Sequence, residues 1–220
     1  MENLSQETAN GTPRRGIFGR LAGAMVLGVT GLIPAASRTL AAASPSDSSH
    51  WPGVLKARHR QVVDAIEPNA GFPLAFAYTF VFPNAPGTAT AVIVLRHTAF
   101  TLALNSDMWA KYKIGEALKI SDPETNAPAV KNPFLHPKPG VLTVDAMAID
   151  KLLATVTIFG ACNVALKVLS GKLAGNAGVT ADAAAKEWAA NIIPGITVIP
   201  SGTWGVNRAQ EAGCTYCAGG

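Results

Sequence analysis

One cysteine in this chain sits where a thiol could react. Cys162 lies in the stretch FGACNVAL, between an apolar run typical of a strand and a run typical of a helix. In an open α/β sheet, ligands bind beyond the carboxyl ends of the strands, and Cys162 falls at such an end. The free N–H groups and the positive dipole at a helix start also stabilise a thiolate. Cys162 is therefore a candidate nucleophile; the alternative is an inert core residue, because free cysteines are often buried.

Arg96 and His97 are the second candidate group. They follow directly on the apolar run 90–95, in the stretch VLRHTAF. If that run and the one before Cys162 are parallel strands, both ends lie at the same edge of the sheet. A guanidinium would stabilise a thiolate or persulfide anion, and an imidazole could accept or return its proton. The alternative is an Arg-His pair in a solvated loop.

Cys214 and Cys217 form a C-x-x-C pair in GCTYC. In a strand these positions point to opposite faces, so a disulfide between them would need a local turn. They could resolve a persulfide, form a disulfide, contribute to a zinc site or simply finish a strand. Haem c attachment is excluded because Ala218, not histidine, follows the pair. The chain has neither a Walker loop nor a G-x-G-x-x-G turn, and we expect no cofactor and no bound metal.

The remaining pattern predicts elements that alternate between strand and helix. Continuous apolarity at 72–82 and 90–95 indicates strands covered on both faces, which is typical of a parallel sheet. Further strands are expected at 155–160 and 195–200, with a last short strand or tail at 214–220. Helices are expected at 50–66, 143–153, 163–174, 180–193 and 201–213, with two short helical pieces between 98 and 120 and a Pro-rich loop at 121–140. This order predicts an α/β three-layer sandwich with a mostly parallel sheet of about five strands. We expect a linker and an N-terminal helix at 44–70 and the α/β domain at 71–220.

The first 43 residues resemble a twin-arginine export signal. Arg14 and Arg15 precede an apolar run at 21–36, and an A-x-A pattern ends at Ala43. We expect cleavage there, passage through the twin-arginine translocase, and a mature protein in the periplasm or outside the cell, with no stable membrane span. Four arginines and two glutamates lie in the signal, so the net charge falls from +4 to +2 on cleavage. No basic cluster remains to predict nucleic-acid binding.

Several stretches together resemble the DsrE/DsrF-like group of sulfur-relay proteins. These are the strand that ends at Arg96 and His97, then VTIFGACNVALKVL, then IIPGITVIPSGTWGVNRAQEAGCTY, and the resemblance covers about 72–217. It implies a flavodoxin-like sandwich, homo-oligomers and chemistry without a metal. It also implies that Cys162 carries sulfur as a persulfide and passes it to a partner's cysteine. The pair Cys214 and Cys217 is not part of the family's core pattern.

Three hypotheses of function follow. The first is an exported protein that binds or transfers sulfane sulfur on Cys162, with Arg96 and His97 as neighbours and a separate protein as sulfur donor or acceptor. The second is a non-catalytic binding protein that uses the sheet edge and the loop at 121–140. The third is a thiol redox protein or metal site that uses all three cysteines.

Overall fold

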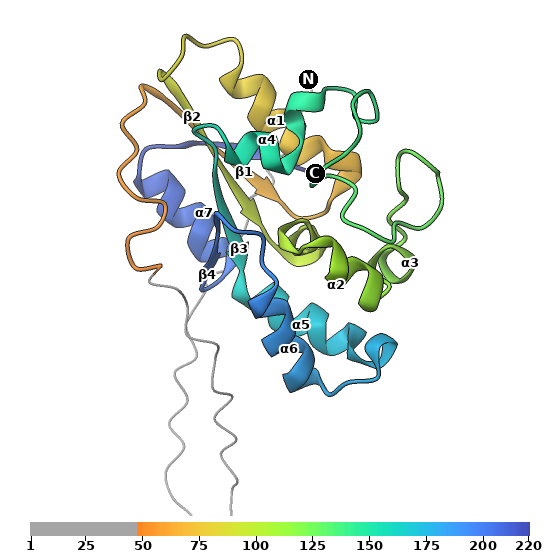
Figure 1. Ribbon diagram of the computed structural model, residues 1–220. Coiled ribbons are helices and arrows are strands. Elements are labelled where there is room, and N and C mark those ends of the chain that lie inside the picture. Colours follow the sequence, from red (N-terminus) through yellow and green to blue (C-terminus); the bar gives the residue numbers. More distant parts are fainter. Residues whose placement is uncertain (1–47) are drawn as a thin grey trace, which may run out of the picture. The chain divides into compact units, whose positions relative to one another are not determined.

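The computed structural model describes residues 48–220 (Figure 1). The predicted export signal at 1–43 lies outside the described residues. In the part that is described, no helix is both long enough and apolar enough to span a bilayer.

Five parallel strands form one sheet in the order β4-β3-β2-β1-β5. They are β1 (His59–Ala65), β2 (Ala89–Leu95), β3 (Ile158–Cys162), β4 (Ile196–Ile199) and β5 (Thr215–Ala218). All seven residues of the central strand β2 are buried, as a parallel sheet with both faces covered requires. The predicted α/β sandwich with a five-stranded parallel sheet is confirmed.

Helices cover the two faces of the sheet unequally. They are α1 (Phe72–Val81), α2 (Ser106–Lys111), α3 (Ile114–Leu118), α4 (Ile149–Leu153), α5 (Asn163–Leu173), α6 (Ala181–Ala190) and α7 (Gly202–Glu211), with a 3-10 helix at His97–Ala103. Buried side chains of α1 to α6 join one large core cluster with one face of the sheet. The smaller cluster on the other face includes Ala209 of α7, together with Trp51 and Val62.

Trp51 completes the thinly covered face next to α7. Its indole Nε1 donates a hydrogen bond to the Phe159 carbonyl oxygen at 3.3 Å, so the ring lies against β3. Two glycines make room there: a Cβ atom at Gly160 would lie 2.6 Å from the Trp51 ring, and one at Gly205 would collide with Ile199. The close approach of α7 and Trp51 to the sheet therefore depends on these glycines.

Two predicted elements are wrong in type. Residues 59–65, expected within a helix, form β1, because Val62 and Val63 serve opposite faces of the sheet: Val62 belongs to the smaller cluster and Val63 to the larger. Residues 72–81, expected as a strand, form α1, which begins after Gly71 (φ +86°) with Pro73 in its first turn. Since β1 is an inner strand, the α/β domain also starts before residue 71.

The other predictions of elements agree with the structure within a few residues. β2, β3 and β4 lie at or near the expected positions, as do the helix after Cys162 and the helix opened by Ser201. The loop at 121–140 contains no helix or strand apart from an isolated bridge between Ser121 and Pro128. Asn132 anchors it, because its buried amide donates hydrogen bonds to the carbonyl oxygens of Leu102 and Leu104 at 3.0 and 2.9 Å.

The contact between Gly160 and Trp51 gives a test of the packing. We expect Gly160→Ala to lower the free energy of unfolding by about 1–3 kcal/mol, because the added methyl group displaces the Trp51 ring. Urea denaturation followed by tryptophan fluorescence measures the change. Gly175→Ala is the control, since a Cβ atom there meets nothing within 4 Å. Equal stability of the two variants would contradict the proposed packing.

Candidate functional site

The carboxyl edge of the sheet brings several of the candidate residues together. Leu95 pairs with Ala161, and Cys162 pairs with Ile199, so the register sets Arg96 and Cys162 at the ends of neighbouring strands. The expectation that these two residues share one edge therefore agrees with the structure.

Cys162 is both the last residue of β3 and the N-cap of α5. Its Sγ accepts a hydrogen bond from the Ala165 backbone N–H at 3.3 Å. This contact places the sulfur at the first turn of an 11-residue helix, at the positive end of the helix dipole. The residue is only 5% exposed and is a free thiol. It lies at the carboxyl edge of the sheet, but its low exposure limits access to the sulfur.

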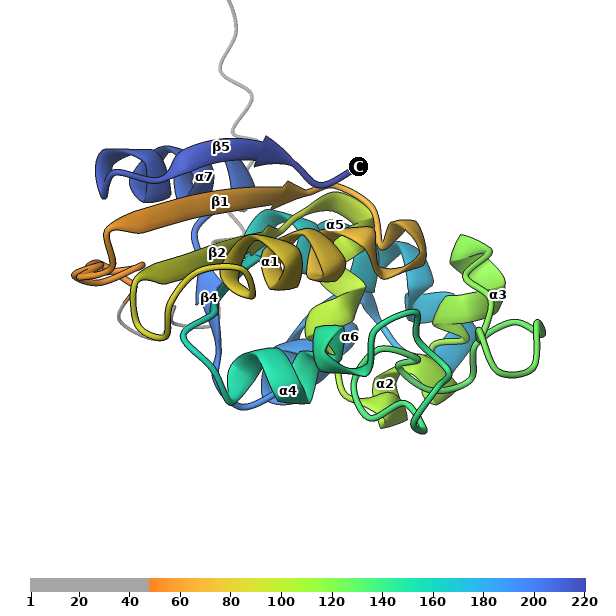
Figure 2. The same cartoon turned by 90° about the horizontal axis from the view of Figure 1, so that it is seen from above.

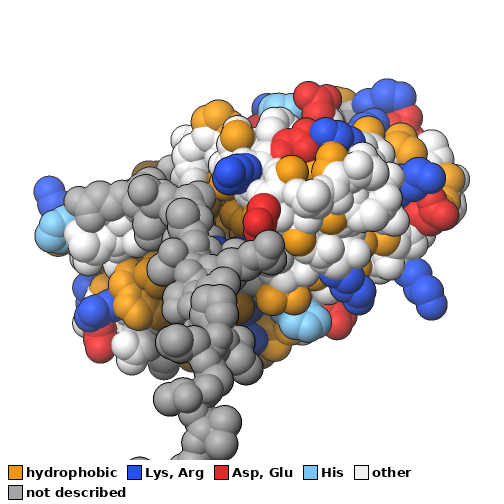
Figure 3. Space-filling model, turned by 90° about the horizontal axis from the view of Figure 1, so that it is seen from below, with side chains coloured by type: hydrophobic (Ala, Val, Ile, Leu, Met, Phe, Trp, Pro, Cys, Tyr) orange, Lys and Arg blue, Asp and Glu red, His pale blue; other side chains and the backbone are white. Residues whose placement is uncertain are grey.

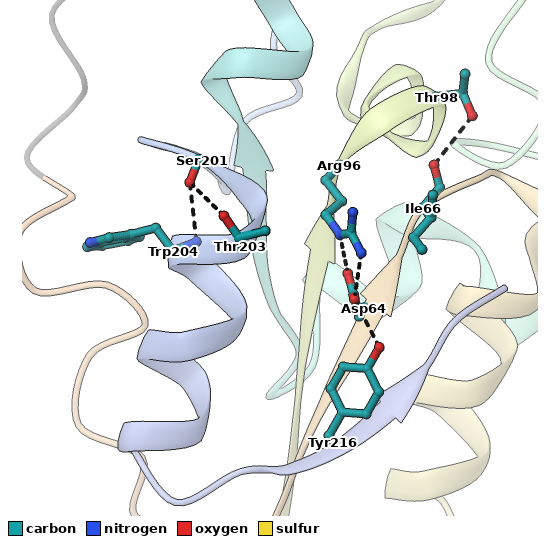
Figure 4. A network of polar contacts seen from close by, with 8 residues as sticks. All are labelled: Asp64, Ile66, Arg96, Thr98, Ser201, Thr203, Trp204 and Tyr216. Carbon is teal, nitrogen blue, oxygen red and sulfur yellow. Dashed lines mark hydrogen bonds and ion pairs between the residues drawn. The ribbon is translucent and has the colours of Figure 1, made fainter. Parts of the chain in front are cut away.

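Arg96 is held by a carboxylate that the sequence reasoning missed. Its Nε and Nη2 donate to Oδ1 and Oδ2 of Asp64 at 2.6 and 2.9 Å, a bidentate ion pair (Figure 4). Tyr216 of β5 donates its hydroxyl proton to Asp64 Oδ2 at 3.0 Å. Asp64 is 5% exposed, and a lone acid in the otherwise apolar run VVDAI was the signal that could have identified it.

Asp64 sets the electrostatics of this edge. The hydrogen bond from Arg96 to Asp64 raises the pKa of Arg96 above its usual value, and burial partly offsets this effect. A weaker charge interaction with Cys162 also raises the pKa of Arg96. The same carboxylate, together with burial, raises the pKa of Tyr216. A thiolate at Cys162 thus feels the guanidinium charge, but the hydrogen bonds of Arg96 go to Asp64.

The first turn of α7 packs on the stem of Arg96. A Cβ atom at Gly202 would lie 2.5 Å from Cβ and Cδ of Arg96. Ser201 caps this helix by accepting a hydrogen bond from the Trp204 backbone N–H at 3.2 Å (Figure 4). Arg96 is therefore fixed on one side by Asp64 and on the other by α7.

His97 is at the same edge but apart from the polar network. It is an exposed residue in the left-handed region (φ +49°) and begins the 3-10 helix His97–Ala103. Within residues 48–220, no side-chain hydrogen bond joins His97 to Cys162 or Arg96. The predicted role in proton transfer has no supporting contact.

Cys214 and Cys217 lie against opposite faces of the sheet. Cys214 belongs to the smaller cluster, with Trp51, whereas Cys217 packs against the larger one. Both are free thiols, as their opposite orientation predicts. Across 48–220, no group of three or more His, Cys, Asp or Glu side chains is arranged to hold a metal ion.

Comparison with known proteins found no significant match to this chain. No family model matches the chain, and neither a curated protein nor a solved structure matches it at a significant level. The DsrE-like resemblance therefore remains a prediction from the residues quoted above.

The Asp64–Arg96 pair predicts a strong effect of neutralising the acid. We expect Asp64→Asn to lower the free energy of unfolding by about 1–3 kcal/mol, because the partly buried guanidinium loses its charged partner. The control is Glu211→Gln, which breaks an exposed pair with Arg208 and should cost less than about 1 kcal/mol. Chemical denaturation of both variants measures the difference, and similar costs would argue against a structural role for Asp64.

The environment of Cys214 predicts its reactivity. Burial raises the pKa of this thiol to about 11, against a smaller opposing effect of Arg60. The thiolate form is thus scarce at neutral pH, and alkylation of Cys214 in the folded protein should become appreciable only as the pH approaches about 11. Peptide mass spectrometry after iodoacetamide labelling across pH measures this, with Cys217, which is less buried, as the internal comparison. Rapid labelling of Cys214 at neutral pH would contradict the prediction.

Proposed function

We propose that the protein carries sulfane sulfur as a persulfide on Cys162. The observation that carries this proposal is the hydrogen bond from the Ala165 N–H to Cys162 Sγ at the start of α5. It places a free thiol at a helix N-terminus, at the carboxyl end of a strand. The resemblance of this stretch to the DsrE/DsrF-like group supports the same role.

The chemistry needs only thiol exchange. The Cys162 thiolate attacks the outer sulfur of a small persulfide or polysulfide; the S–S bond of the donor breaks, and the rest of the donor leaves as a thiolate. In the second step an acceptor thiolate attacks the outer sulfur of the Cys162 persulfide, and Cys162 leaves as a thiolate. No net oxidation occurs, and the helix dipole stabilises Cys162 as the leaving group.

Arg96 contributes a nearby positive charge to this proposal. The persulfide is an anion at neutral pH, and the guanidinium lies within electrostatic range of Cys162. Asp64 and α7 hold that guanidinium in place. Arg96 is thus a positioning and charge-balancing residue rather than a group that must move to reach the sulfur.

The setting of this activity is also a proposal. We infer that residues 1–43 direct the protein through the twin-arginine translocase and that it works in the periplasm or outside the cell. The twin arginines, the apolar run and the A-x-A pattern support this. A sulfur donor or acceptor protein would then be found in the same compartment.

A loading experiment tests the role of Cys162. Reduced, folded protein is treated with inorganic polysulfide, trapped with an alkylating reagent and mapped by peptide mass spectrometry. We expect one added sulfur on Cys162, loss of that addition in Cys162→Ser, and no loss in the control Cys217→Ser. Sulfur found on Cys217 alone, with Cys162 unmodified, would refute the proposal.

The low exposure of Cys162 favours one alternative, a non-catalytic binding protein. A thiol that is 5% exposed is shielded from a protein acceptor in this conformation. Under this alternative, Cys162 of the folded protein stays unlabelled by iodoacetamide while Cys217 reacts. The arrangement gives no support to a redox or metal site that uses all three cysteines, because Cys162 and Cys214 belong to clusters on opposite faces of the sheet.

A further inference from the structure

The segment before β1 carries a strongly exposed apolar side chain. Trp51 and Leu55 hold the segment on the thinly covered face of the sheet: the ring centroids of Trp51 and Trp204 are 6.3 Å apart, and Leu55 packs against the smaller cluster. Between the two, Gly53 turns the chain (φ +84°), and the next residue, Val54, is 88% exposed. A single exposed valine is common on protein surfaces, so its meaning depends on the charges beside it.

Those charges are all positive. Between residues 48 and 63 the chain has Lys56, Arg58 and Arg60 and neither Asp nor Glu. Lys56 and Arg58 are exposed, and in the described part of the chain neither forms an ion pair with a carboxylate. Arg60 Nη1 donates a hydrogen bond to the Leu55 carbonyl oxygen at 3.3 Å. The 54–60 patch therefore joins an apolar tip to three cations without a counter-charge of its own.

The 54–60 patch is remote from the candidate site. Figure 2 shows the segment at the amino end of β1, whereas Cys162 is at the carboxyl end of β3, which runs parallel. Seen from below, Lys, Arg and His side chains lie beside hydrophobic ones at the left of the molecule, where Figure 1 places this segment and α7 (Figure 3). An interaction through this patch would leave the carboxyl edge of the sheet free.

We propose that the 54–60 patch binds the surface of an anionic phospholipid bilayer. Val54 enters the boundary between the head groups and the acyl chains, and Lys56 and Arg58 contact the lipid phosphates. Both parts are needed, since one valine gives little affinity and exposed charges alone are screened by salt. The binding is peripheral and reversible.

A bilayer fits this patch better than other anionic partners. It offers phosphates and hydrocarbon in one plane, whereas a nucleic acid would offer phosphates but no apolar partner for Val54. The place of the patch in the chain points the same way, because Val54 follows shortly after Ala43, where the expected export signal ends. While such a signal is engaged with the translocase, the patch is held close to the membrane. This last argument rests on the proposed export.

Vesicle binding by the full chain tests the charged part of the patch. Lys56→Gln combined with Arg58→Gln removes two charges from the patch. The matched control, Lys167→Gln combined with Lys172→Gln, removes two from exposed positions of α5. Co-sedimentation with phosphatidylcholine vesicles that contain phosphatidylglycerol measures the partition coefficient. We expect it to fall by about 10- to 30-fold in the patch variant and by less than about 3-fold in the control.

A second pair of variants tests the apolar part. Val54→Ser should lower the partition coefficient by about 3-fold or more, because the lost side chain no longer leaves water on binding. Val168→Ser is the control, since Val168 is 62% exposed on α5, outside the patch, and should leave binding unchanged. Circular dichroism checks that all variants are folded. Any binding through residues 1–47 is common to all of them and cancels in the comparison.

The proposal is supported if the unsubstituted protein and both α5 controls bind the anionic vesicles more tightly than the two patch variants. It is overturned if the unsubstituted protein does not bind, if the patch variants bind as it does, or if the α5 charge control loses as much affinity as the patch variant. Binding that depends on Lys56 and Arg58 but not on Val54, and that polyglutamate abolishes by competition, would overturn it in favour of an acidic protein partner.

Discussion

The requirement that both faces of a parallel sheet be covered governs this structure. One face is covered by many elements, because buried side chains of the six helices α1 to α6 join the larger core cluster. On the other face the smaller cluster relies on α7 and Trp51, and Gly160 and Gly205 bring them close enough to fill it. The cover is thin there, so small changes in side-chain volume at the contact between Trp51 and β3 have large effects on packing. The same helix α7 also bears on the candidate site, through its first turn against Arg96.

The ion pair of Asp64 and Arg96 links the stability of the sheet to its chemistry. Asp64 is at the end of β1, Arg96 follows β2, and Tyr216 belongs to β5, so one carboxylate ties three neighbouring strands together. It also fixes the guanidinium where its charge is felt at Cys162. A residue at this edge therefore cannot be assigned to structure or to function alone. Variants at Asp64 should be judged by stability and thiol reactivity together.

The sequence predicted the class of fold and the position of Cys162 well, because both depend on local patterns. Strand-then-helix runs and a cysteine between them are visible in one dimension. It failed at α1, because a helix that is apolar on all sides has no periodicity to distinguish it from a buried strand. It failed at β1, because the adjacent residues Val62 and Val63 serve opposite faces. The partner of Arg96 could not be predicted from the sequence for another reason. Asp64 is 32 residues away in the chain, and only the pairing of β1 with β2 brings the two side chains together.

The placement of β5 bears on how the chain reaches this fold. β1 pairs with β2, which comes soon after it, but its other edge pairs with β5, and Tyr216 and Asp64 are 152 residues apart. During synthesis, therefore, the outer edge of β1 stays unpaired until nearly all of the other elements have emerged from the ribosome. An open strand edge is a template for wrong pairing, and contacts between distant residues form slowly. The folding of this protein should thus be limited by closure of the sheet at β5, and the period before closure is when the nascent chain is most exposed to aggregation.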